Sequence, residues 1–476
     1  MQSTSTANTD TQITHLFDQQ KHYLTVLKRR SANERSRKLK GLAEFIKEHK
    51  LQIEEAAYKD FYKPAMEVRA MEIYPVLNEI KHIRKNINKW MQPQHVSGGL
   101  KLMGTQSKIF REPKGQVLVI SPWNYPFNLS MIPLINAMAA GNSVILKPSE
   151  QSRHTSELLQ YVIESVFESQ EAAVVQGDEH VAQALLEKPF NHVIFTGSQR
   201  VGKQVMEKAS ANLTEITLEL GGKSPALIDT DADLKKAIPA IVWGKFANAG
   251  QTCIAPDYVL APSNRRNEVV EALSQLIKKA YGDTDQIQNG KDFARIVNKH
   301  HFRRVLNLMQ EALDKGATLA YGGDYVESDR FIEPTILTFV RKDAALRREE
   351  IFGPVLPVFT YESIDQAIDY INSGKRPLTV YAFTRHNDKA DQFSGSIIAG
   401  SVVINEVFSS YINPNLPFGG INDSGIGELH GEFGFRTLSN EKAVHHRKRG
   451  WTLAELLQPP YRKGRQKLAR FIMKYF

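Results

Sequence analysis

His192-Val-Ile-Phe-Thr-Gly-Ser-Gln-Arg-Val-Gly202 joins an apolar run directly to a helical pattern through Gly197 and Ser198. The apolar part predicts a buried strand over His192–Thr196. Free N–H groups and the dipole at the start of the following helix can hold a pyrophosphate, and Gly197 permits a close backbone approach. Gly-x-Gly-x-x-Gly is missing, so a strict search for the dinucleotide fingerprint would pass over this stretch. The strand-to-helix junction itself is typical of an α/β protein.

Strand and helix patterns alternate on both sides of this junction. We predict strands over Val117–Ser121, Ser143–Lys147 and Ala173–Val175, and helices over Ser156–Ser169 and Glu179–Glu187. From Leu218 onward a second series follows, with strands at Pro225–Ile228 and Ala255–Leu260 and helices at Ala232–Trp243 and Glu268–Tyr281. The alternation predicts two α/β domains, each with a mostly parallel sheet covered on both faces.

Other segments depart from this alternation. Residues from Thr11 to about Met91 predict long amphipathic helices, Ser97–Lys114 predicts a hairpin, and Val444–Arg449 predicts a closing strand. Asn405–Gly427 is rich in Gly, Pro, Asn and Ser with little periodicity, so we expect a long loop there.

The composition is that of a globular protein. The 476 residues are 42% hydrophobic and 24% charged, enough for two or three domains, and no apolar run approaches the roughly 20 residues of a membrane span. Met1–Thr14 lacks the pattern of a secretory signal, so we expect a cytoplasmic protein. The net charge of +9 is spread among acidic residues outside the C-terminus, and no nucleic-acid-binding motif accompanies it, so we expect no nucleic-acid partner.

The single cysteine, Cys253, excludes an internal disulfide and any cysteine-cluster metal site. It lies in Phe246-Ala-Asn-Ala-Gly-Gln-Thr-Cys-Ile-Ala-Pro256, among small and polar residues that let solvent approach the sulfur. Two interpretations stay open at this point: a buried thiol that fills the core, and a nucleophile. A nucleophile attacks as a thiolate, so its surroundings should lower the pKa or offer a base.

Two further segments carry polar groups suited to catalysis. Glu219 stands between two leucines and before a double glycine, so desolvation should raise its pKa and favour a general base; pairing with Lys223 is the alternative. In Ile120-Ser-Pro-Trp-Asn-Tyr-Pro-Phe127, Asn124 can donate amide hydrogens to a developing oxyanion, or it can complete an Asx-turn before proline.

Taken together and in order, these segments resemble the aldehyde dehydrogenase superfamily. The signatures are Glu-Leu-Gly-Gly-Lys at 219–223, Gly-Gln-Thr-Cys at 250–253, Glu-Glu-Ile-Phe-Gly-Pro-Val at 349–355 and Leu-Pro-Phe-Gly-Gly at 416–420. The likeness spans about residues 15–450. Trp243–Tyr258 and Pro122–Asn128 look like the class 3 branch, shorter dimeric enzymes that act on aromatic and medium- or long-chain aldehydes.

The resemblance implies a fold, a division of the chain and an assembly. It implies an α/β protein with a Rossmann-like NAD(P)-binding domain over residues 10–96 and 116–219 and a catalytic domain over 220–428. Residues 97–115 and 429–450 would be the oligomerisation elements of a homodimer, followed by a basic amphipathic tail over 451–476.

The resemblance also assigns roles to residues. Cys253 would attack the aldehyde and carry a thioester, Glu219 would be the base, and Asn124 with the Cys253 N–H would form the oxyanion hole; Glu350 is a second candidate base. NAD is the expected coenzyme with NADP also accepted, although the acid at Glu150 should repel a 2′-phosphate, and no metal is expected. The residues expected to bind the coenzyme are Trp123, Lys147, Glu150, Gly197, Ser198, Val201, Gly202, Leu220, Glu350 and Phe352.

Two rival functions and one departure stay open. A related enzyme class passes the acyl group to coenzyme A, although a base for water such as Glu219 would then serve no purpose. A structural protein on a dehydrogenase scaffold is the other rival. The sequence departs from the branch at Ile421-Asn-Asp-Ser-Gly-Ile-Gly427, where Asp423 adds an anion and puts the substrate preference in question.

The C-terminal segment from Tyr461 to Phe476 contains six basic residues and no acid. Leu468, Phe471 and Ile472 are among the apolar positions that recur at helical spacing on one face. This pattern is typical of a helix at an anionic membrane surface, so peripheral membrane contact through residues 461–476 is one prediction. Docking on the protein or on a partner subunit is the alternative.

Overall fold

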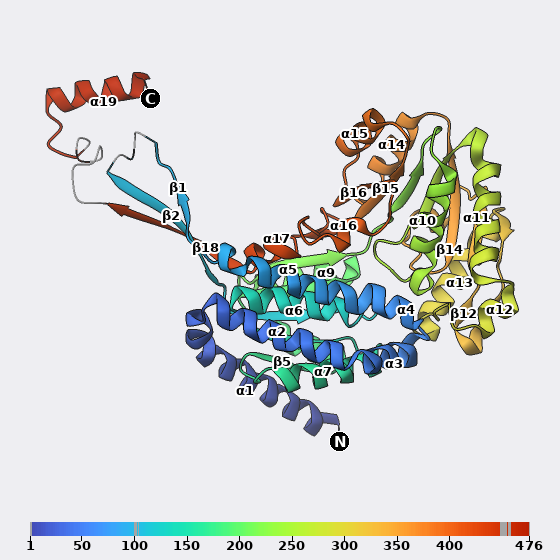
Figure 1. Ribbon diagram of the computed structural model, residues 1–476, viewed down its shortest axis with the longest axis horizontal. Coiled ribbons are helices and arrows are strands. Elements are labelled where there is room, and N and C mark those ends of the chain that lie inside the picture. The colour runs from blue at the N-terminus through green and yellow to red at the C-terminus, as the bar shows by residue number, and fades with distance from the viewer. Residues whose placement is uncertain (1, 100–101, 103, 448–454, 456–457, 476) are drawn as a thin grey trace.

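The computed structural model describes residues 2–99, 102, 104–447, 455 and 458–475. Two α/β bodies lie side by side, and a narrow three-stranded arm extends from one of them and ends near the C-terminal helix (Figure 1). The α/β fold with parallel sheets expected from the sequence is confirmed. No helix of the described part of the chain combines the length and the apolar character needed to cross a bilayer.

The first body is built on a six-stranded sheet of order β17-β7-β6-β3-β4-β5. Neighbouring strands from β7 to β5 are parallel, and β17 adds to β7 in the antiparallel sense. The strands are β3 (Gln116–Ile120), β4 (Ser143–Lys147), β5 (Ala172–Val174), β6 (His192–Gly197), β7 (Glu215–Leu220) and β17 (Gly425–Ile426).

Alternate residues of these strands enter two different cores. Val117 and Val119 pack into the layer formed by the N-terminal helices and by α6 and α7, whereas Leu118 and Ile120 face the core of α1, α8 and α9. Successive side chains of a strand point to opposite faces, and both faces of β3 are covered by a core, so both are apolar. The helices are α1 (Gln2–Arg29), α2 (Ala32–Glu48), α3 (Lys50–Phe61), α4 (Ala65–Val68), the π-turn η1 (Arg69–Ile73), α5 (Tyr74–Trp90), α6 (Asn128–Ala140), α7 (Arg153–Val166), α8 (Glu179–Leu186), α9 (Gln199–Ser210) and α17 (Gly431–Thr437).

The second body is built on a seven-stranded sheet of order β10-β13-β14-β9-β8-β15-β16, parallel except for β10. Its strands are β8 (Pro225–Ile228), β9 (Tyr258–Pro262), β10 (Thr318–Tyr321), β13 (Thr335–Thr338), β14 (Val355–Tyr361), β15 (Thr379–Phe383) and β16 (Ser401–Ile404); β11 (Tyr325–Val326) and β12 (Phe331–Ile332) form a small hairpin. Its helices are α10 (Leu234–Phe246), α11 (Arg266–Tyr281), α12 (Thr284–Asn289), α13 (Lys299–Asp314), α14 (Ile364–Ser373), α15 (Asn387–Ser396) and α16 (Ser409–Ile412), with short 3₁₀ turns η3 (Ala247–Gly250), η4 (Ser263–Arg265), η5 (Glu327–Asp329) and η6 (Ala345–Arg347).

The arm consists of β1 (Gln94–Val96), β2 (Thr105–Pro113) and β18 (Ser439–Arg447), all antiparallel. The hairpin therefore begins three residues before the predicted Ser97. The closing strand predicted at Val444–Arg449 starts earlier, because Ser439 already pairs with Pro113; residues 448 and 449 lie outside the described part. Helix α19 (Lys463–Tyr475) is drawn beyond the tip of this arm (Figure 1).

Two sequence expectations are corrected. Asn405–Gly427 is not a plain loop: it contains α16 and β17, and its Ser424 carbonyl accepts the N–H of Leu220 at 2.9 Å. The strand expected from Ala255 starts at Tyr258, because Pro256 has no N–H to donate and the Asp257 N–H bonds the Ser224 carbonyl at 2.7 Å.

Candidate active site

Cys253 follows a tightly held turn at the end of α10. Asn248, Ala249 and Gly250 all have positive φ, at 52°, 51° and 75°, a conformation that is costly for residues other than glycine. The buried Gln251 amide fastens the turn, since it donates to the carbonyls of Asn248 and Arg295 at 2.9 and 3.0 Å. The chain therefore presents Cys253 at a fixed position, with its side chain only partly buried.

Cys253 lines two cavities of more than 300 Å³ that differ in character. One of about 390 Å³ is bounded by η1, α10 and α16, and of the described residues that line it only Arg69 is charged. The other, of about 310 Å³, is bounded by the ends of β6 and β7 and contains Glu219, Glu350 and Asn124. The thiol is thus where an apolar chamber meets a polar one, and the interpretation of Cys253 as core filler is not supported.

Glu219 lies near the end of β7 and is 5% exposed. Neither of its carboxyl oxygens has a hydrogen-bond partner. Burial, with a smaller contribution from Glu428, raises the pKa of this carboxyl well above its usual range. The alternative pairing with Lys223 is wrong, because the Lys223 ammonium contacts Asp257 instead.

Glu350 is the second carboxyl of the polar cavity. One of its oxygens accepts the Gly222 N–H at 3.1 Å, so this side chain is oriented by the backbone of the double glycine. Burial and the nearby Asp257 raise the pKa of Glu350 to about 8.

The thiol itself is not activated by its surroundings. Burial, followed by the neighbouring Glu350 and Glu219 carboxylates, raises the pKa of Cys253 to about 12. The sequence left two routes to a thiolate, a lowered thiol pKa or a neighbouring base, and the prediction of a lowered pKa is wrong. A base or an incoming positive charge therefore has to promote deprotonation of Cys253.

Asn124 is 3% exposed, and both its side chain and its backbone carbonyl form hydrogen bonds. Its side-chain amide donates to the Gln251 carbonyl at 3.0 Å, which leaves the second amide hydrogen for another acceptor. Its backbone carbonyl accepts the Lys63 ammonium and the Asn248 amide, both at 2.9 Å. Lys63 is fully buried and paired with Glu72 at 2.8 Å, so a buried ion pair supports the segment that carries Asn124.

The expected coenzyme residues fall into two groups. Trp123, Gly197, Ser198, Leu220, Glu350 and Phe352 line the polar cavity together with Cys253. Lys147, Glu150, Val201 and Gly202 do not line it. Lys147 and Glu150 form an ion pair of 2.8 Å after β4, and Val201 and Gly202 lie in the first turn of α9.

The strand-to-helix junction fits a dinucleotide. β6 ends at Gly197, and the Ser198 hydroxyl caps α9 by accepting the Val201 N–H at 3.4 Å. Gly202 packs on Leu220 so closely that a Cβ there would overlap the leucine side chain. A groove with glycine backbone, an open helix N-terminus and an aromatic wall from Trp123 and Phe352, whose rings are 5.4 Å apart, is suited to a pyrophosphate with a flat ring beside it.

Sequence reasoning missed three residues near this chemistry. Arg304 and His301 line the polar cavity, where the Arg304 guanidinium bonds the Glu350 carbonyl at 3.0 Å. Lys245 is fully buried with no hydrogen-bond partner for its amine, and burial lowers its pKa to about 8. The helix predicted over Ala232–Trp243 ended before Lys245, so the sequence gave no prediction for this residue; the signal that could have revealed it is a lysine among apolar residues eight positions before Cys253.

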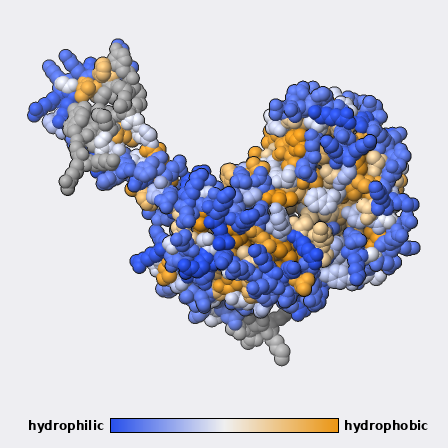
Figure 2. Space-filling model, in the orientation of Figure 1, coloured by the Kyte–Doolittle hydropathy of each residue, from blue (hydrophilic) through white to orange (hydrophobic). Residues whose placement is uncertain are grey.

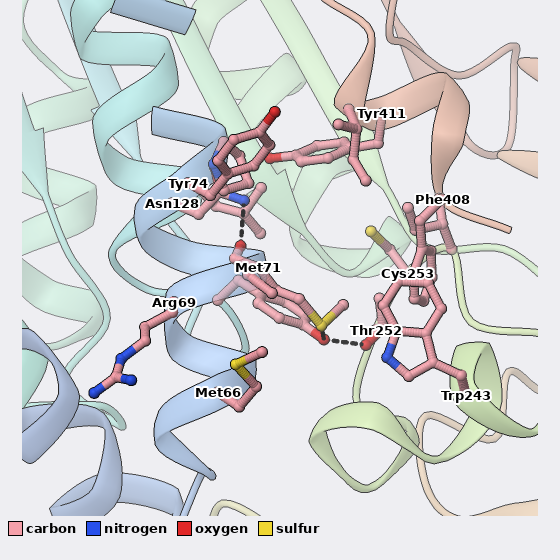
Figure 3. Close-up of a pocket in the computed structure, with 16 residues that line it drawn as sticks. Met66, Arg69, Met71, Tyr74, Asn128, Trp243, Thr252, Cys253, Phe408 and Tyr411 are labelled. Atoms are coloured by element: carbon pink, nitrogen blue, oxygen red, sulfur yellow. Dashed lines mark hydrogen bonds between the residues drawn. The ribbon is translucent and has the colours of Figure 1, made fainter. Parts of the chain in front are cut away.

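The apolar chamber was also beyond sequence reasoning, because its walls come from distant segments. Figure 3 shows Met66, Met71 and Tyr74 on one side and Trp243, Thr252, Cys253 and Phe408 on the other; Tyr411 also lines the chamber. The η1 segment replaces a regular helical turn here, as π-turns often do at functional sites.

Comparison with known proteins agrees with this geometry. The aldehyde dehydrogenase family matches residues 2–444 of the chain. The 4,4′-diaponeurosporen-aldehyde dehydrogenase of Staphylococcus aureus is 41% identical, over 86% of this chain and 88% of that protein. Aldehyde dehydrogenase family 3 member B1 of Rattus norvegicus is 39% identical over 91% of each.

Solved structures are similar over nearly the whole chain. A substrate-bound aldehyde dehydrogenase, AldH, of Staphylococcus aureus has a TM-score of 0.92 and 38% identity, covering 97% of this chain and 99% of that one. An aldehyde dehydrogenase of Mycobacterium tuberculosis complexed with NAD⁺ has a TM-score of 0.85 and 28% identity, covering 94% and 92%. The glyceraldehyde-3-phosphate dehydrogenase GapN of Methanocaldococcus jannaschii complexed with NADP has a TM-score of 0.84 and 27% identity, covering 92% and 95%.

The chain is a member of the aldehyde dehydrogenase family. Its similarity to family 3 members agrees with the class 3 resemblance found in the sequence, and it is an enzyme of the aldehyde dehydrogenase type.

Proposed function

We propose that this enzyme oxidises elongated or aromatic apolar aldehydes to carboxylates with NAD or NADP, through a thioester on Cys253. The observation that carries the proposal is the position of Cys253 between an apolar chamber and a polar cavity that contains the unpartnered Glu219. An apolar chain can reach the thiol from one side, while water and the coenzyme reach it from the other.

In this mechanism the Cys253 thiol passes its proton to the ionised Glu219 carboxylate as the sulfur adds to the aldehyde carbonyl and forms a thiohemiacetal. The free hydrogen of the Asn124 amide and the Cys253 N–H stabilise the oxyanion that develops, and one such donor contributes roughly 3–4 kcal/mol. A nicotinamide bound beside Cys253 would supply the hydride acceptor for this oxidation. Cys253 then holds the acyl group as a thioester until a water molecule releases the acid.

We assign the activation of that water to Glu219. Both of its oxygens are without partners, whereas one oxygen of Glu350 is already engaged by the Gly222 N–H. The raised pKa of Glu219 makes it a stronger base once ionised. Glu350, with a pKa near 8, is the competing base and a suitable acceptor for ribose hydroxyls.

The coenzyme would lie along the ends of β4, β6 and β7. Gly197, Ser198, Val201 and Gly202 would hold the pyrophosphate and adenine, and Lys147 with Glu150 would hold the adenosine ribose. Leu220, Trp123 and Phe352 would flank the nicotinamide, with Glu350 on its ribose. Similar proteins have been solved with NAD⁺ and with NADP, which supports use of either coenzyme.

The test is a panel of aliphatic and aromatic aldehydes with NAD and with NADP, followed by NADH or NADPH absorbance and by identification of the product. We expect kcat/KM to rise with the apolar length of the aldehyde. Free acid formed equally with and without coenzyme A supports hydrolysis; an absolute need for coenzyme A would replace the proposal with acyl transfer. No turnover with any aldehyde would favour a structural protein.

We also propose that the arm joins two copies in a homodimer. Residues 10–96 and 116–219 would form the coenzyme domain, 220–428 the catalytic domain, and 97–115 with 429–450 the dimer elements. β18 is exposed along most of its length, and an uncovered sheet edge favours pairing. Light scattering after size exclusion should give twice the chain mass of 53.7 kDa.

The C-terminal helix supports a further proposal about location, namely peripheral contact of a cytoplasmic enzyme with an anionic membrane. Phe471 and Met473 of α19 are 55% and 77% exposed, and basic residues surround them. Co-sedimentation with phosphatidylserine vesicles should be lost in a chain ending at Pro460. Equal sedimentation of both chains would instead favour docking on the enzyme or on a second copy.

A further inference from the structure

A third cavity lies on the second body, outside the two cavities described above. It occupies about 620 Å³ between the sheet strands β9 and β14, the helix α14 and the segment 342–348. None of its lining residues lines either cavity that contains Cys253. Two of the elements that bound it, β14 and α14, are labelled in Figure 1.

The lining of this third cavity carries positive charge only. Five cationic side chains line it and, among the described residues, no carboxylate does. One of them, Lys223, is neutralised by Asp257. The other four have no ion pair with a carboxylate in the described part of the chain: Lys342, Arg347, Arg348 and Lys375. Such a concave arrangement of uncompensated cations attracts anions and holds them more strongly than a flat surface does.

Arg347 is fixed in place before any ligand arrives. Its guanidinium donates twice to the Val340 carbonyl, at 3.0 and 2.8 Å, and its centre lies 3.8 Å from the centroid of the Phe359 ring. Its third nitrogen lies 3.4 Å from the Tyr370 hydroxyl. A guanidinium held in this way loses little conformational freedom on binding an anion, which favours affinity.

The inner wall is apolar. Leu260, Phe359 and Ile371 contribute to it, and the Tyr258 ring lies tilted by 32° against Phe359 with 5.3 Å between ring centroids. The cavity volume falls in the range of roughly 300–1,000 Å³ that is usual for small organic ligands. An inorganic ion would use only part of this space, so the cavity favours a ligand with an anionic group and a flat or apolar body.

We propose that this cavity is a binding site for a small organic phosphate of about the size of a nucleoside monophosphate, separate from the coenzyme site. The phosphate would lie among Lys342, Arg347 and Arg348, and the organic body would lie against the apolar wall. The site borders the active centre through Lys223, whose ammonium also donates to the Glu349 carbonyl at 2.8 Å, next to Glu350.

The test uses uridine 5′-monophosphate as the probe, titrated into the full-length enzyme by calorimetry with NAD already saturating. We expect one molecule to bind per chain, with uridine and inorganic phosphate binding more weakly. Lys342→Gln with Arg348→Gln should weaken binding about tenfold or more. The matched control, Lys50→Gln with Lys85→Gln, removes two exposed charges elsewhere and should leave the affinity unchanged.

Three outcomes would overturn the proposal: no binding of the probe to the wild type, equal weakening by the two double variants, or displacement of the probe by NAD. Should the first double variant not fold, Lys375→Gln, at an exposed position, provides the comparison against Lys50→Gln. Binding of NAD is measured in a separate calorimetric titration of NAD into the enzyme without the probe. A failure of the proposed coenzyme use is therefore seen separately from a failure of this site.

Discussion

The two cavities that meet at Cys253 differ in what their walls offer to a reacting molecule. The chamber under η1 and α16 is bounded mostly by methionine, aromatic and aliphatic side chains. The cavity at the ends of β6 and β7 contains two buried carboxyls, an amide and a glycine-rich backbone. One side can select a substrate by apolar contact, and the other can perform proton transfer and hold a coenzyme.

The buried acidic groups of the polar cavity do not activate the thiol by themselves. Burial raises the pKa of both carboxyls and of the thiol. Smaller contributions come from Glu428 at Glu219, from Asp257 at Glu350 and from these two carboxylates at Cys253. A positively charged ring that enters the polar cavity would lower the pKa of Cys253. Nucleophilic reactivity would then depend on the coenzyme being present first.

Removal of the Cys253 sulfur, which lines both cavities, should have the largest effect on activity. Cys253→Ala should reduce NADH formation on the order of 10⁴-fold or more with every aldehyde, because no covalent intermediate can form. NAD binding, measured by calorimetry, should be retained. Turnover within tenfold of the wild type would show that the two cavities do not act through this sulfur.

Removal of the base in the polar cavity should have the next largest effect. Glu219→Gln should lower steady-state turnover about 10²- to 10⁴-fold, since water attack on the thioester loses its proton acceptor. A rapid first burst of NADH should remain, and mass spectrometry should detect the acylated chain. Glu350→Gln is the comparison. If the acyl-enzyme accumulates in Glu350→Gln and not in Glu219→Gln, then Glu350 is the base that activates water.

A charge in the apolar chamber should change selectivity rather than chemistry. Ile412→Asp introduces a carboxylate at the wall formed by α16, which should lower kcat/KM for a long-chain aldehyde about 10- to 100-fold. Acetaldehyde, which fills little of the chamber, should be affected less than about threefold. Ile412→Leu, of the same volume, serves as the control, and equal losses for both aldehydes would argue against the chamber as the substrate route.

A change at the far end of the proposed coenzyme site should have a smaller effect. Glu150→Gln removes the carboxylate that pairs with Lys147, so repulsion of a 2′-phosphate should fall. We expect kcat/KM with NADP to rise about fivefold relative to that with NAD. An unchanged ratio would mean that the adenosine ribose lies away from residue 150.

The smallest expected effect is on stability. Because the folded-state pKa of Glu219 is raised above its unfolded value of about 4.3, its contribution to stability is full below that pH and declines as pH rises through the folded value. Glu219→Gln cannot ionise, so it should be more stable than the wild type by about 1 kcal/mol at alkaline pH, with little difference near pH 4. Thermal melts across pH would reveal this trend; a constant difference would contradict it.

Much of the fold and part of the site could be predicted from residue patterns alone. Alternating strand and helix patterns gave the two parallel sheets, and the predicted strand ends at residues 147 and 196 lie within one residue of the ends of β4 and β6, whereas β7 was not predicted. The predictions were wrong where backbone chemistry or pairing with a distant segment sets the bounds of an element. Examples are the start of β9, the start of β18 and the short elements α16 and β17 within Asn405–Gly427.

Other features had no local signal. The Lys63–Glu72 pair joins residues nine apart, but it acts on Asn124, which lies about sixty positions further on. Burial of Lys245 without a hydrogen-bond partner depends on what packs around α10, and the predicted helix ended before it, at Trp243. Pocket walls assembled from η1, α10 and α16 follow from the packing of the two bodies.

The sequence by itself determined the chemistry available to this protein: one thiol in a small-residue turn, a carboxyl between leucines and a glycine junction after a strand. Those properties are local, because they depend on residue type and on neighbours within a few positions. The tertiary structure alone decided that the thiol has a high pKa, that Glu219 is unpaired and that an apolar chamber ends at the sulfur. Each of these depends on desolvation and on distances between segments remote in the chain, which only packing establishes.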